Sequence, residues 1–395
     1  MSVLDELLNH NKWLEFLEHK ESFYMYQEEY ESIKKFIEKK KYYDISKQIV
    51  DGNYVFSIPR KKFINKSWTT KKRIVYTYKY NEMIVLKMIH YLLKKYDNLL
   101  SPNCYSFRGD ISPKQAFFNI TNYGNLNFGY KVDIHNYFNS ISIDKLLNML
   151  EGKIDNKVYQ LFKQLLTNDQ VIVGGEVIKE QKGVMAGTPI SCFLSNVYLS
   201  ELDFYFINKK YARYADDIII FADTKEELLE MVDYIHSFFK KYGLEINRDK
   251  EHYYENNEKF EFLGFSYNNG VIDLSDKAIL KMKAKIRRKS RALRRWKLRK
   301  DIPGVSAMKA LNNIFNYKFY HKGDNKELNW SIWYFPTINT DKSLKVIDLY
   351  FQQYLRYIAT GKHNGKRYWN IRYNDLKKSG YRSLVHEYYE YKNKH

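Results

Sequence analysis

The sequence has little cysteine and little proline, and both shortages limit the classes of protein to which it can belong. Its 395 residues include two cysteines and six prolines. Two thiols, Cys104 and Cys192, cannot build a disulfide scaffold or a cysteine-type zinc site, and they suit a reducing compartment. No proline-rich, glycine/serine-rich or repeated segment interrupts the chain. We therefore expect closely joined, packed subdomains and a cytoplasmic location.

Long apolar stretches are also missing. No segment of the sequence is long and apolar enough to span a bilayer. The first twenty or so residues are amphipathic and carry acids, whereas a secretory signal has a basic start followed by an unbroken apolar stretch. We expect neither a signal peptide nor a membrane partner.

Positive charge, by contrast, is in excess. The chain has 66 Lys and Arg against 46 Asp and Glu, a formal charge of +20. A surplus of this size indicates a polyanionic partner. The 37 tyrosines add flat rings that can stack on unpaired bases. Because an AT-rich genome also enriches Lys and Tyr whatever the function, composition alone does not decide between these explanations.

The spacing of apolar residues predicts a mixed α+β chain. Apolar residues at helical spacing indicate helices, alternating apolar residues indicate strands, and turn-forming residues indicate where these elements end. In chain order we expect a helical segment over residues 2–50, a basic hairpin over 54–80 followed by a long helix, a strand over 127–138, a helix from Ser142, a strand–turn–strand over 208–223, a helix ending at Gly243, a hairpin over 260–275, and helices from Lys277 onward.

Three aspartates stand where acids are hard to explain structurally. Asp216 and Asp217 are expected in the turn between two apolar strands, where neighbouring carboxylates repel one another and only Arg213 is close in sequence. Asp133 is expected at the end of an otherwise apolar strand. Nucleotidyl transfer needs acids that hold two metal ions roughly 4 Å apart. A solvated acidic turn is the plain alternative for the pair alone, but the three together outline one metal site.

An ordered series of motifs resembles the bacterial reverse transcriptases. The series covers roughly residues 60 to 290 and consists of KKRIVYTYKY, NCYSFRGD, VDIHNYFNSI, GVMAGTPISCFLSNVYLSELD, YARYADDIIIFAD, GLEINRDKEHYY and FEFLGF. The resemblance implies a right-hand polymerase with fingers, a palm containing an antiparallel sheet, and a thumb. It implies these domains: a helical N-terminal extension over 1–55, fingers over 56–125, palm over 126–272, and a helical thumb with a C-terminal extension over 273–395.

The same resemblance assigns roles to individual residues. It implies that Asp133, Asp216 and Asp217 bind two Mg²⁺ ions, for which Mn²⁺ is a possible substitute, and that the backbone of Ile134 lies near the metal. Five further residues would contact the incoming deoxynucleoside triphosphate or the template. Phe138 would be a ring that excludes a 2′-hydroxyl, Lys72 and Arg73 would clamp the triphosphate, and Arg108 and Lys250 would face template or nucleotide.

One motif departs from the family pattern. Family members commonly carry Gln before the Gly of the template-contacting motif, whereas this chain has Ala186 before Gly187. The hydrogen bond of that Gln cannot form, although Ser191 and Asn196 keep their places, so Ala186, Gly187 and Ser191 are the expected template contacts. The departure resembles the defence-associated and abortive-infection ("unknown group") enzymes. Neither a retron-type NAxxH element nor an HNH-like cluster is found in the sequence.

The region after the palm is basic and then rich in rings. The helix expected over residues 281–300 suits a thumb that follows a duplex backbone, and its candidate nucleic-acid contacts are Arg287, Arg288, Arg294 and Arg295. A solvated helix is the alternative. The Trp- and Tyr-rich segments beyond it could stack on single-stranded RNA or form the core of a small helical module.

These observations give one leading hypothesis and three rivals. The leading hypothesis is an RNA-directed DNA polymerase that uses an associated non-coding RNA, makes a DNA product and acts in anti-phage defence. The rivals are a template-independent or protein-primed DNA polymerase, a non-catalytic RNA-binding protein of polymerase shape, and an RNA polymerase, which Phe138 disfavours. The sequence does not indicate the oligomeric state.

Overall fold

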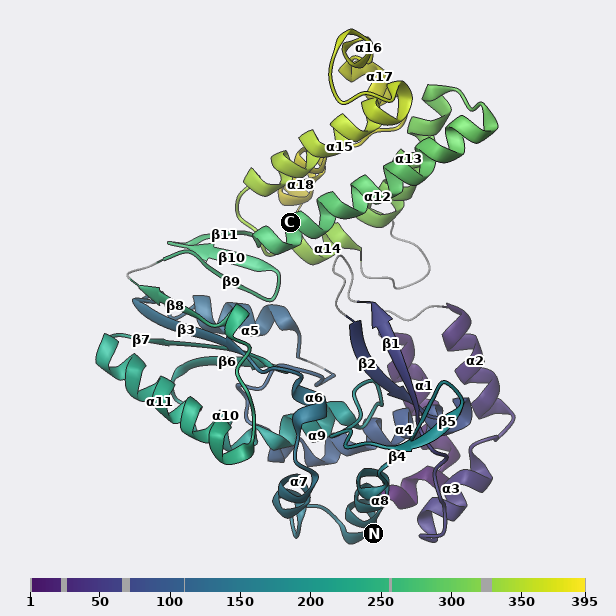
Figure 1. The fold of residues 1–395 in the computed structure, drawn as a ribbon, viewed down its shortest axis with the longest axis vertical. Coiled ribbons are helices and arrows are strands. Elements are labelled where there is room, and N and C mark those ends of the chain that lie inside the picture. Colours follow the sequence, from purple (N-terminus) through teal and green to yellow (C-terminus); the bar gives the residue numbers. More distant parts are fainter. Residues whose placement is uncertain are drawn as a thin grey trace. The chain divides into compact units, whose positions relative to one another are not determined.

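The computed structural model describes residues 2–22, 27–65, 72–109, 111–255, 258–320 and 329–394. These residues form two compact units, Met1–Glu258 and Lys259–His395 (Figure 1). The domain limits that the resemblance implies separate fingers, palm and thumb, whereas the two compact units are defined by their internal contacts. The predicted limits are therefore not tested by this division and stay a prediction. No helix in the described ranges combines the length and apolarity that a membrane crossing requires.

The N-terminal unit begins with helices, as the apolar spacing predicts. Trp13 and Phe16 are fully buried, and the Trp13 indole donates a hydrogen bond to the Leu7 carbonyl at 2.9 Å. This segment packs on α4, the helix that follows the first hairpin. The helices are η1 (Val3–Leu8), α1 (His10–Ser22), α2 (Gln27–Glu38), α3 (Tyr43–Val50), α4 (Tyr80–Leu92) and η2 (Leu93–Leu99).

The central sheet of this unit is antiparallel, with the strand order β6-β7-β3-β8. Tyr130 on β3 points to the helix α11, where its hydroxyl lies 2.9 Å from His236 Nε2. Because side chains alternate along a strand, Lys131 points to the other face, and so does the residue that ends β3. The strands are β3 (Phe128–Asp133), β6 (Lys210–Tyr214), β7 (Asp217–Ala222) and β8 (His252–Glu255). The helices of this region are α5 (Pro113–Thr121), α6 (Tyr137–Ser140), α7 (Ile143–Leu150), α8 (Asn156–Thr167), α9 (Ser191–Tyr198), α10 (Ser200–Tyr205), α11 (Lys225–Tyr242) and η3 (Arg248–Lys250).

A second sheet of the N-terminal unit joins two hairpins from distant parts of the sequence. Its order is β2-β1-β4-β5, and β1 and β4 pair in parallel through Arg60 and Ile172. The first hairpin is the predicted basic one, with the tip residues 66–71 outside the described ranges. The second was missed, although two glycines between alternating apolar residues signal a tight turn. The strands are β1 (Arg60–Asn65), β2 (Lys72–Thr77), β4 (Gln170–Val173) and β5 (Glu176–Lys179).

The C-terminal unit starts with a three-stranded antiparallel sheet and continues as helices. The sequence predicts a hairpin here, and the structure adds a third strand. The long helices α12, α13 and α15 lie side by side (Figure 1). The elements are β9 (Phe260–Phe262), β10 (Phe265–Asn268), β11 (Val271–Leu274), α12 (Asp276–Lys300), α13 (Gly304–Tyr320), α14 (Trp330–Tyr334), α15 (Lys342–Thr360), α16 (Lys366–Trp369), α17 (Tyr373–Lys378) and α18 (Leu384–Lys394).

Most predicted boundaries hold, with two local corrections. Ser142 precedes α7, and Gly243 ends α11 in the left-handed conformation. The strand predicted over 127–138 stops at Asp133, because residues 137–140 form the short helix α6. Of the acid pair, only Asp216 lies in the turn, since Asp217 is already the first residue of β7.

Candidate active site

The three aspartates meet at one end of the central sheet. Asp133, the last residue of β3, pairs directly with Asp217, the first residue of β7. Cross-strand partners project from the same face of a sheet, so both carboxylates lie on the Lys131 face. Asp216 occupies the β6–β7 turn, and its carbonyl accepts a hydrogen bond from the Ile134 N–H at 3.2 Å. The local reason is simple: two apolar strands of matched length bring both strand ends and the turn together.

The carboxylates have few cations to balance them. Asp133 is buried, its Oδ2 accepts from Lys250 Nζ at 2.5 Å, and its Oδ1 accepts from Asn247 Nδ2 at 2.9 Å. Lys131 Nζ lies 3.7 Å from Asp217 Oδ1. Burial, and then the charge of Asp133, raise the pKa of Asp216 to about 6. Both causes disfavour the ionised carboxyl, and a bound cation would favour it.

The donor set fits a divalent metal, although its side chains are not yet gathered for one. Carboxylate oxygens are the ligands that Mg²⁺ prefers. Within the residues described, no three His, Cys, Asp or Glu side chains are grouped closely enough to hold a metal ion. Lys250 and Asn247 each donate to one oxygen of Asp133. Lys250 and Asn247 thus hold Asp133 in place beside Asp216 and Asp217.

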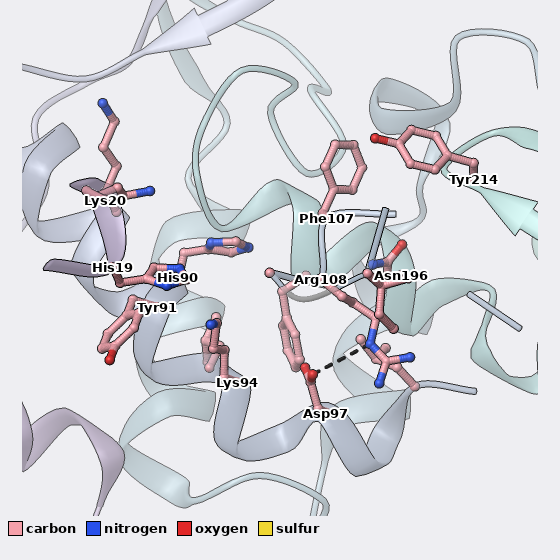
Figure 2. Close-up of a pocket in the computed structure, with 16 residues that line it drawn as sticks. His19, Lys20, His90, Tyr91, Lys94, Asp97, Phe107, Arg108, Asn196 and Tyr214 are labelled. Carbon is pink, nitrogen blue, oxygen red and sulfur yellow. Dashed lines mark ion pairs between the residues drawn. The ribbon is translucent and has the colours of Figure 1, made fainter. Parts of the chain in front are cut away.

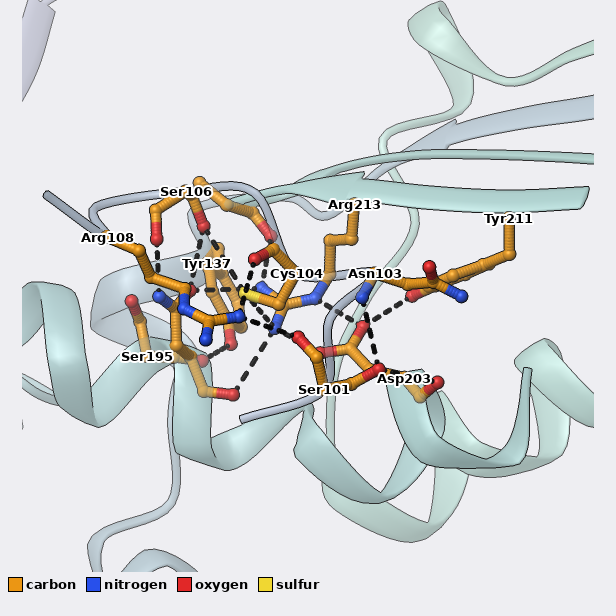
Figure 3. Close-up of polar contacts among 12 residues, drawn as sticks. Ser101, Asn103, Cys104, Ser106, Arg108, Tyr137, Ser195, Asp203, Tyr211 and Arg213 are labelled. Carbon is orange, nitrogen blue, oxygen red and sulfur yellow. Dashed lines mark hydrogen bonds and ion pairs between the residues drawn. The ribbon is translucent and has the colours of Figure 1, made fainter. Parts of the chain in front are cut away.

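A buried ion pair lies directly behind the acid turn. Arg213 and Asp203 are both fully buried, and the guanidinium donates from Nε to Oδ1 at 2.7 Å and from Nη2 to Oδ2 at 2.5 Å (Figure 3). Arg213 Nη1 also donates to the carbonyl of Ala215 at 3.1 Å, and Ala215 has a φ of +56°. Burial alone would lower the pKa of Arg213, but Asp203 outweighs it and raises this pKa.

Arg213 therefore positions the turn rather than neutralising the acid pair. The sequence suggested Arg213 as the nearest cation to Asp216 and Asp217, but its guanidinium is paired with Asp203. Asp203 was missed altogether. The available signal was an acid within the apolar helix sequence SELDFYF, which a charged side chain enters only when it has a partner.

The expected triphosphate and template residues come together at the second sheet. Lys72 and Arg73 are exposed on β2, and Lys72 Nζ lies 6.0 Å from the centre of the Phe63 ring. The carbonyl of Ala186 accepts from the Tyr76 N–H on the same strand at 2.7 Å. Gly187, at a φ of +98°, lies so close that an added Cβ would be 3.0 Å from Val75 Cβ. The loop around Ala186 is thus attached to the strand that carries Lys72 and Arg73.

Phe138 is half-buried in α6, next to the same loop. The Phe138 carbonyl accepts from the Val184 N–H at 2.9 Å, and its ring centre is 6.1 Å from that of Phe107. Phe138 is therefore not a strand residue of the core, which was the alternative to a role at the site. Gly183 allows this approach: its φ is +51°, and an added Cβ would lie 2.2 Å from the Phe138 carbonyl oxygen.

Replacing Gly183 with alanine should destabilise the protein by more than the backbone strain alone. Gly174 is the matched control, because its φ of +61° is similar and nothing lies within 4 Å of an added Cβ. Both variants carry about 1 kcal/mol of left-handed strain, and Gly183→Ala adds a backbone clash of about 1–3 kcal/mol. Thermal unfolding of the two variants checks this. Equal melting temperatures would show that the loop yields without cost.

Two of the expected template residues are held inward. Arg108 Nη1 donates to the Ser101 carbonyl at 3.0 Å, and Arg108 Nε lies 3.5 Å from Asp97 Oδ2 (Figure 2). The hydroxyl of buried Ser191 donates to the Thr188 carbonyl at 2.6 Å. Both side chains thus have structural contacts, and their template roles stay predictions.

The C-terminal unit holds the basic helix α12. Arg287, Arg288 and Arg295 are exposed, whereas Arg294 is half-buried and donates to the Ile358 carbonyl at 3.2 Å. The rings that follow supply much of the core of this unit, and the most buried of them are Phe315, Phe319, Phe335, Phe351 and Tyr388. For these rings the helical-module interpretation is confirmed. The nucleic-acid role of the arginines stays a prediction.

A family model described as reverse transcriptase (RNA-dependent DNA polymerase) matches residues 58–267, or 210 of the 395 residues. The chain belongs to the reverse transcriptase family. The matched region contains Asp133, Asp216 and Asp217 together with the Ala186 loop. The mixed α+β architecture, with an antiparallel central sheet, agrees with the fold class that the resemblance implied.

Individual relatives of this reverse transcriptase cover it only in part. A putative COX1/OXI3 intron 2 protein of Saccharomyces cerevisiae is 30% identical over 131 residues, which are 32% of this chain and 15% of that protein. A structure of apo telomerase from Candida tropicalis matches 82% of this chain and 67% of its own, at 13% identity and a TM-score of 0.45. A structure of telomerase from Candida albicans with a TWJ fragment of telomeric RNA matches 82% of this chain and 62% of its own, at 14% identity and a TM-score of 0.45.

Proposed function

We propose that this protein copies RNA into DNA by metal-dependent nucleotidyl transfer at Asp133, Asp216 and Asp217. The observation that carries the proposal is the direct pairing of Asp133 with Asp217 beside the Asp216 turn. Two Mg²⁺ ions, when bound, would neutralise charge that develops on the phosphate oxygens. Lys72 and Arg73 are suited to the triphosphate of the incoming nucleotide, because both are exposed cations on the strand bonded to the Ala186 loop.

The test is DNA synthesis by the purified full-length chain. An RNA template with a DNA primer, deoxynucleoside triphosphates and Mg²⁺ or Mn²⁺ should yield a product whose sequence complements the template. A product unrelated to the template would favour the template-independent or protein-primed rival. Absence of synthesis with every template and primer would favour the non-catalytic RNA binder.

The finer assignment is to the bacterial defence-associated branch, acting in the cytoplasm with a dedicated non-coding RNA. Ala186 supports it, because it stands where the family commonly carries Gln. The test is to purify the protein from cells and to sequence the RNA and DNA that remain bound. A single RNA species with matching DNA supports the assignment, whereas a random sample of cellular RNA contradicts it.

Replacing Phe138 with alanine should admit ribonucleotides. Its ring lies half-buried beside the loop over 183–187, where it would meet a 2′-hydroxyl on the sugar of the incoming nucleotide. Loss of such a steric contact changes discrimination by about 10- to 200-fold. The measurement is the ratio of kcat/KM for a ribonucleotide and the matching deoxynucleotide. Phe204→Ala is the control, since it removes an exposed phenylalanine ring of α10, and an unchanged ratio in Phe138→Ala would contradict the gate.

A further inference from the structure

A cationic cavity lies in the N-terminal unit, between α1, α4 and the loop that contains Arg108. Its volume is about 290 Å³. Four cationic side chains line it: Lys20 of α1, Lys87 of α4, Lys94 of η2, and Arg108. Lys20, Lys94 and Arg108 are labelled in Figure 2. We call it the Lys20–Lys94 pocket. Of these four residues, only Arg108 was predicted from the sequence to contact nucleic acid.

Among the residues described, the lining of this pocket has more cations than carboxylates. Asp97 is the one carboxylate of that described lining, and it lies beside Arg108. Lys87 is paired with Glu29 from α2. Within the described residues, no carboxylate is within ion-pair distance of Lys20 or Lys94, whose ammonium groups lie 5.4 Å from the ring centres of Phe16 and Tyr91. Burial, and then Lys87, lower the pKa of Lys20, and burial with Lys20 and Lys94 lowers that of His90 to about 4.

The opposite end of the pocket is lined by rings and adjoins the acids. Phe107 is 39% exposed and has a φ of +59°, a conformation that bulky residues rarely adopt. Its ring centre is 6.1 Å from that of Tyr214, and Tyr214 pairs with Asp217 across the β6–β7 turn. One end of the pocket thus offers cations and the other offers aromatic faces.

We propose that the Lys20–Lys94 pocket binds the phosphate and base of an unpaired nucleotide next to the active site. Lys20 and Lys94 would contact the phosphate, and Phe107 and Tyr214 would stack on the base. A nucleotide within a bound single strand fits best, because the ring end opens beside the residue paired with Asp217. A free nucleotide has the same chemistry and is the other source. The proposal deepens the proposed function by giving α1 a part in holding nucleic acid.

The experiment measures binding of a short, labelled single-stranded RNA to the full-length chain by fluorescence anisotropy over about 50–200 mM salt. The variant Lys20→Gln/Lys94→Gln should bind about tenfold more weakly. Removing two phosphate contacts should also reduce the slope of log affinity against log salt by about 1.4. The matched control is Lys39→Gln/Lys41→Gln, which removes two exposed lysines between α2 and α3 and should change affinity less than twofold.

A second variant changes the shape of the pocket while its charge is kept. An added Cβ on Gly109 would lie 2.8 Å from Lys94 Nζ, and Gly109 has no positive φ to strain an alanine. Gly109→Ala should therefore weaken RNA binding with the melting temperature unchanged. Equal affinity of both pocket variants and the wild type, for RNA and for a nucleoside monophosphate alike, would overturn the proposal.

Titration with a nucleoside monophosphate separates the two sources. Weaker RNA binding by the pocket variants, with monophosphate binding unchanged, assigns the site to the strand. Weaker monophosphate binding with unchanged RNA binding assigns it to a free nucleotide. None of these readouts needs DNA synthesis, so an inactive wild-type chain that still loses affinity in the variants would contradict the proposed function and support the pocket.

Discussion

Asp216→Asn should abolish DNA synthesis and at the same time make the metal-free protein more stable. An amide cannot replace a carboxylate as a Mg²⁺ ligand of equal charge, and loss of charge neutralisation worth several kcal/mol corresponds to at least about a thousandfold loss of rate. The gain in stability has a separate cause. The pKa of Asp216 is raised to about 6 by burial and by Asp133, so the ionised side chain destabilises the folded state at neutral pH.

The sign of the pH effect follows from proton binding. Between the unfolded pKa near 4 and the folded pKa of about 6, the folded protein binds more protons at Asp216 than the unfolded chain does. Wild-type stability therefore falls as pH rises through this window. At pH 7 and above, Asp216→Asn should exceed the wild type by about 3 kcal/mol in free energy of unfolding without metal, and this advantage should disappear as pH falls towards 4.

Denaturant unfolding at several pH values, with and without Mg²⁺, measures both effects. Added Mg²⁺ should stabilise the wild type and not the variant, since a ligand stabilises the state that binds it. Asp144→Asn is the control, because Asp144 is an exposed acid in the first turn of α7. Unimpaired synthesis by Asp216→Asn would remove the metal-dependent mechanism, and a stability equal to wild type at pH 8 would contradict the raised pKa.

Arg213→Met should be the most destabilising single substitution in the central sheet. It leaves the Asp203 carboxylate buried without its two hydrogen bonds from the guanidinium, and breaking a buried ion pair costs about 3–5 kcal/mol. It also removes the contact with the Ala215 carbonyl. Arg248→Met is the matched control, because the pair between Arg248 and Glu251 has an arginine side chain that is 74% exposed, and such pairs contribute about 1 kcal/mol or less.

The denaturant midpoint and the synthesis rate together distinguish two contributions of Arg213. The double variant Arg213→Met/Asp203→Leu removes both charges and should recover much of the stability. Its synthesis rate should stay low, because the Ala215 carbonyl remains without its donor. Full recovery of the rate in the double variant would show that Arg213 acts only through stability.

The acids could be predicted from the sequence, but their surroundings could not. Asp133 and Asp217 stand at the ends of mostly apolar strand sequences, and these two strands pair with their ends aligned, so a local pattern was sufficient to find them. The contact of Lys250 with Asp133 joins residues 117 positions apart, and the Arg213–Asp203 pair connects a strand to a helix. Such contacts leave no periodic pattern in the sequence. A single basic or acidic residue reads the same in the sequence whether its side chain is exposed to solvent or buried with a partner.

The remaining errors have equally local causes. Phe138 was assigned to a strand because aromatic and apolar residues continue beyond Asp133, yet Asn136 adopts a φ of +48° and ends the extended chain. The β4–β5 hairpin was missed because its strands have only four residues each. The cavity beside α1 was not visible in any motif, since its walls come from three segments far apart in the sequence.

The hydrogen bond between Tyr76 and the Ala186 carbonyl has a mechanical consequence. It joins the hairpin that carries Lys72 and Arg73 to the loop next to Phe138. Gly187 of that loop also lies in close contact with Val75 of the hairpin. A displacement of the hairpin towards an arriving triphosphate must therefore shift the loop as well. Binding of the triphosphate by the hairpin and contact of Phe138 with the sugar would then occur in one coupled motion rather than in two successive steps.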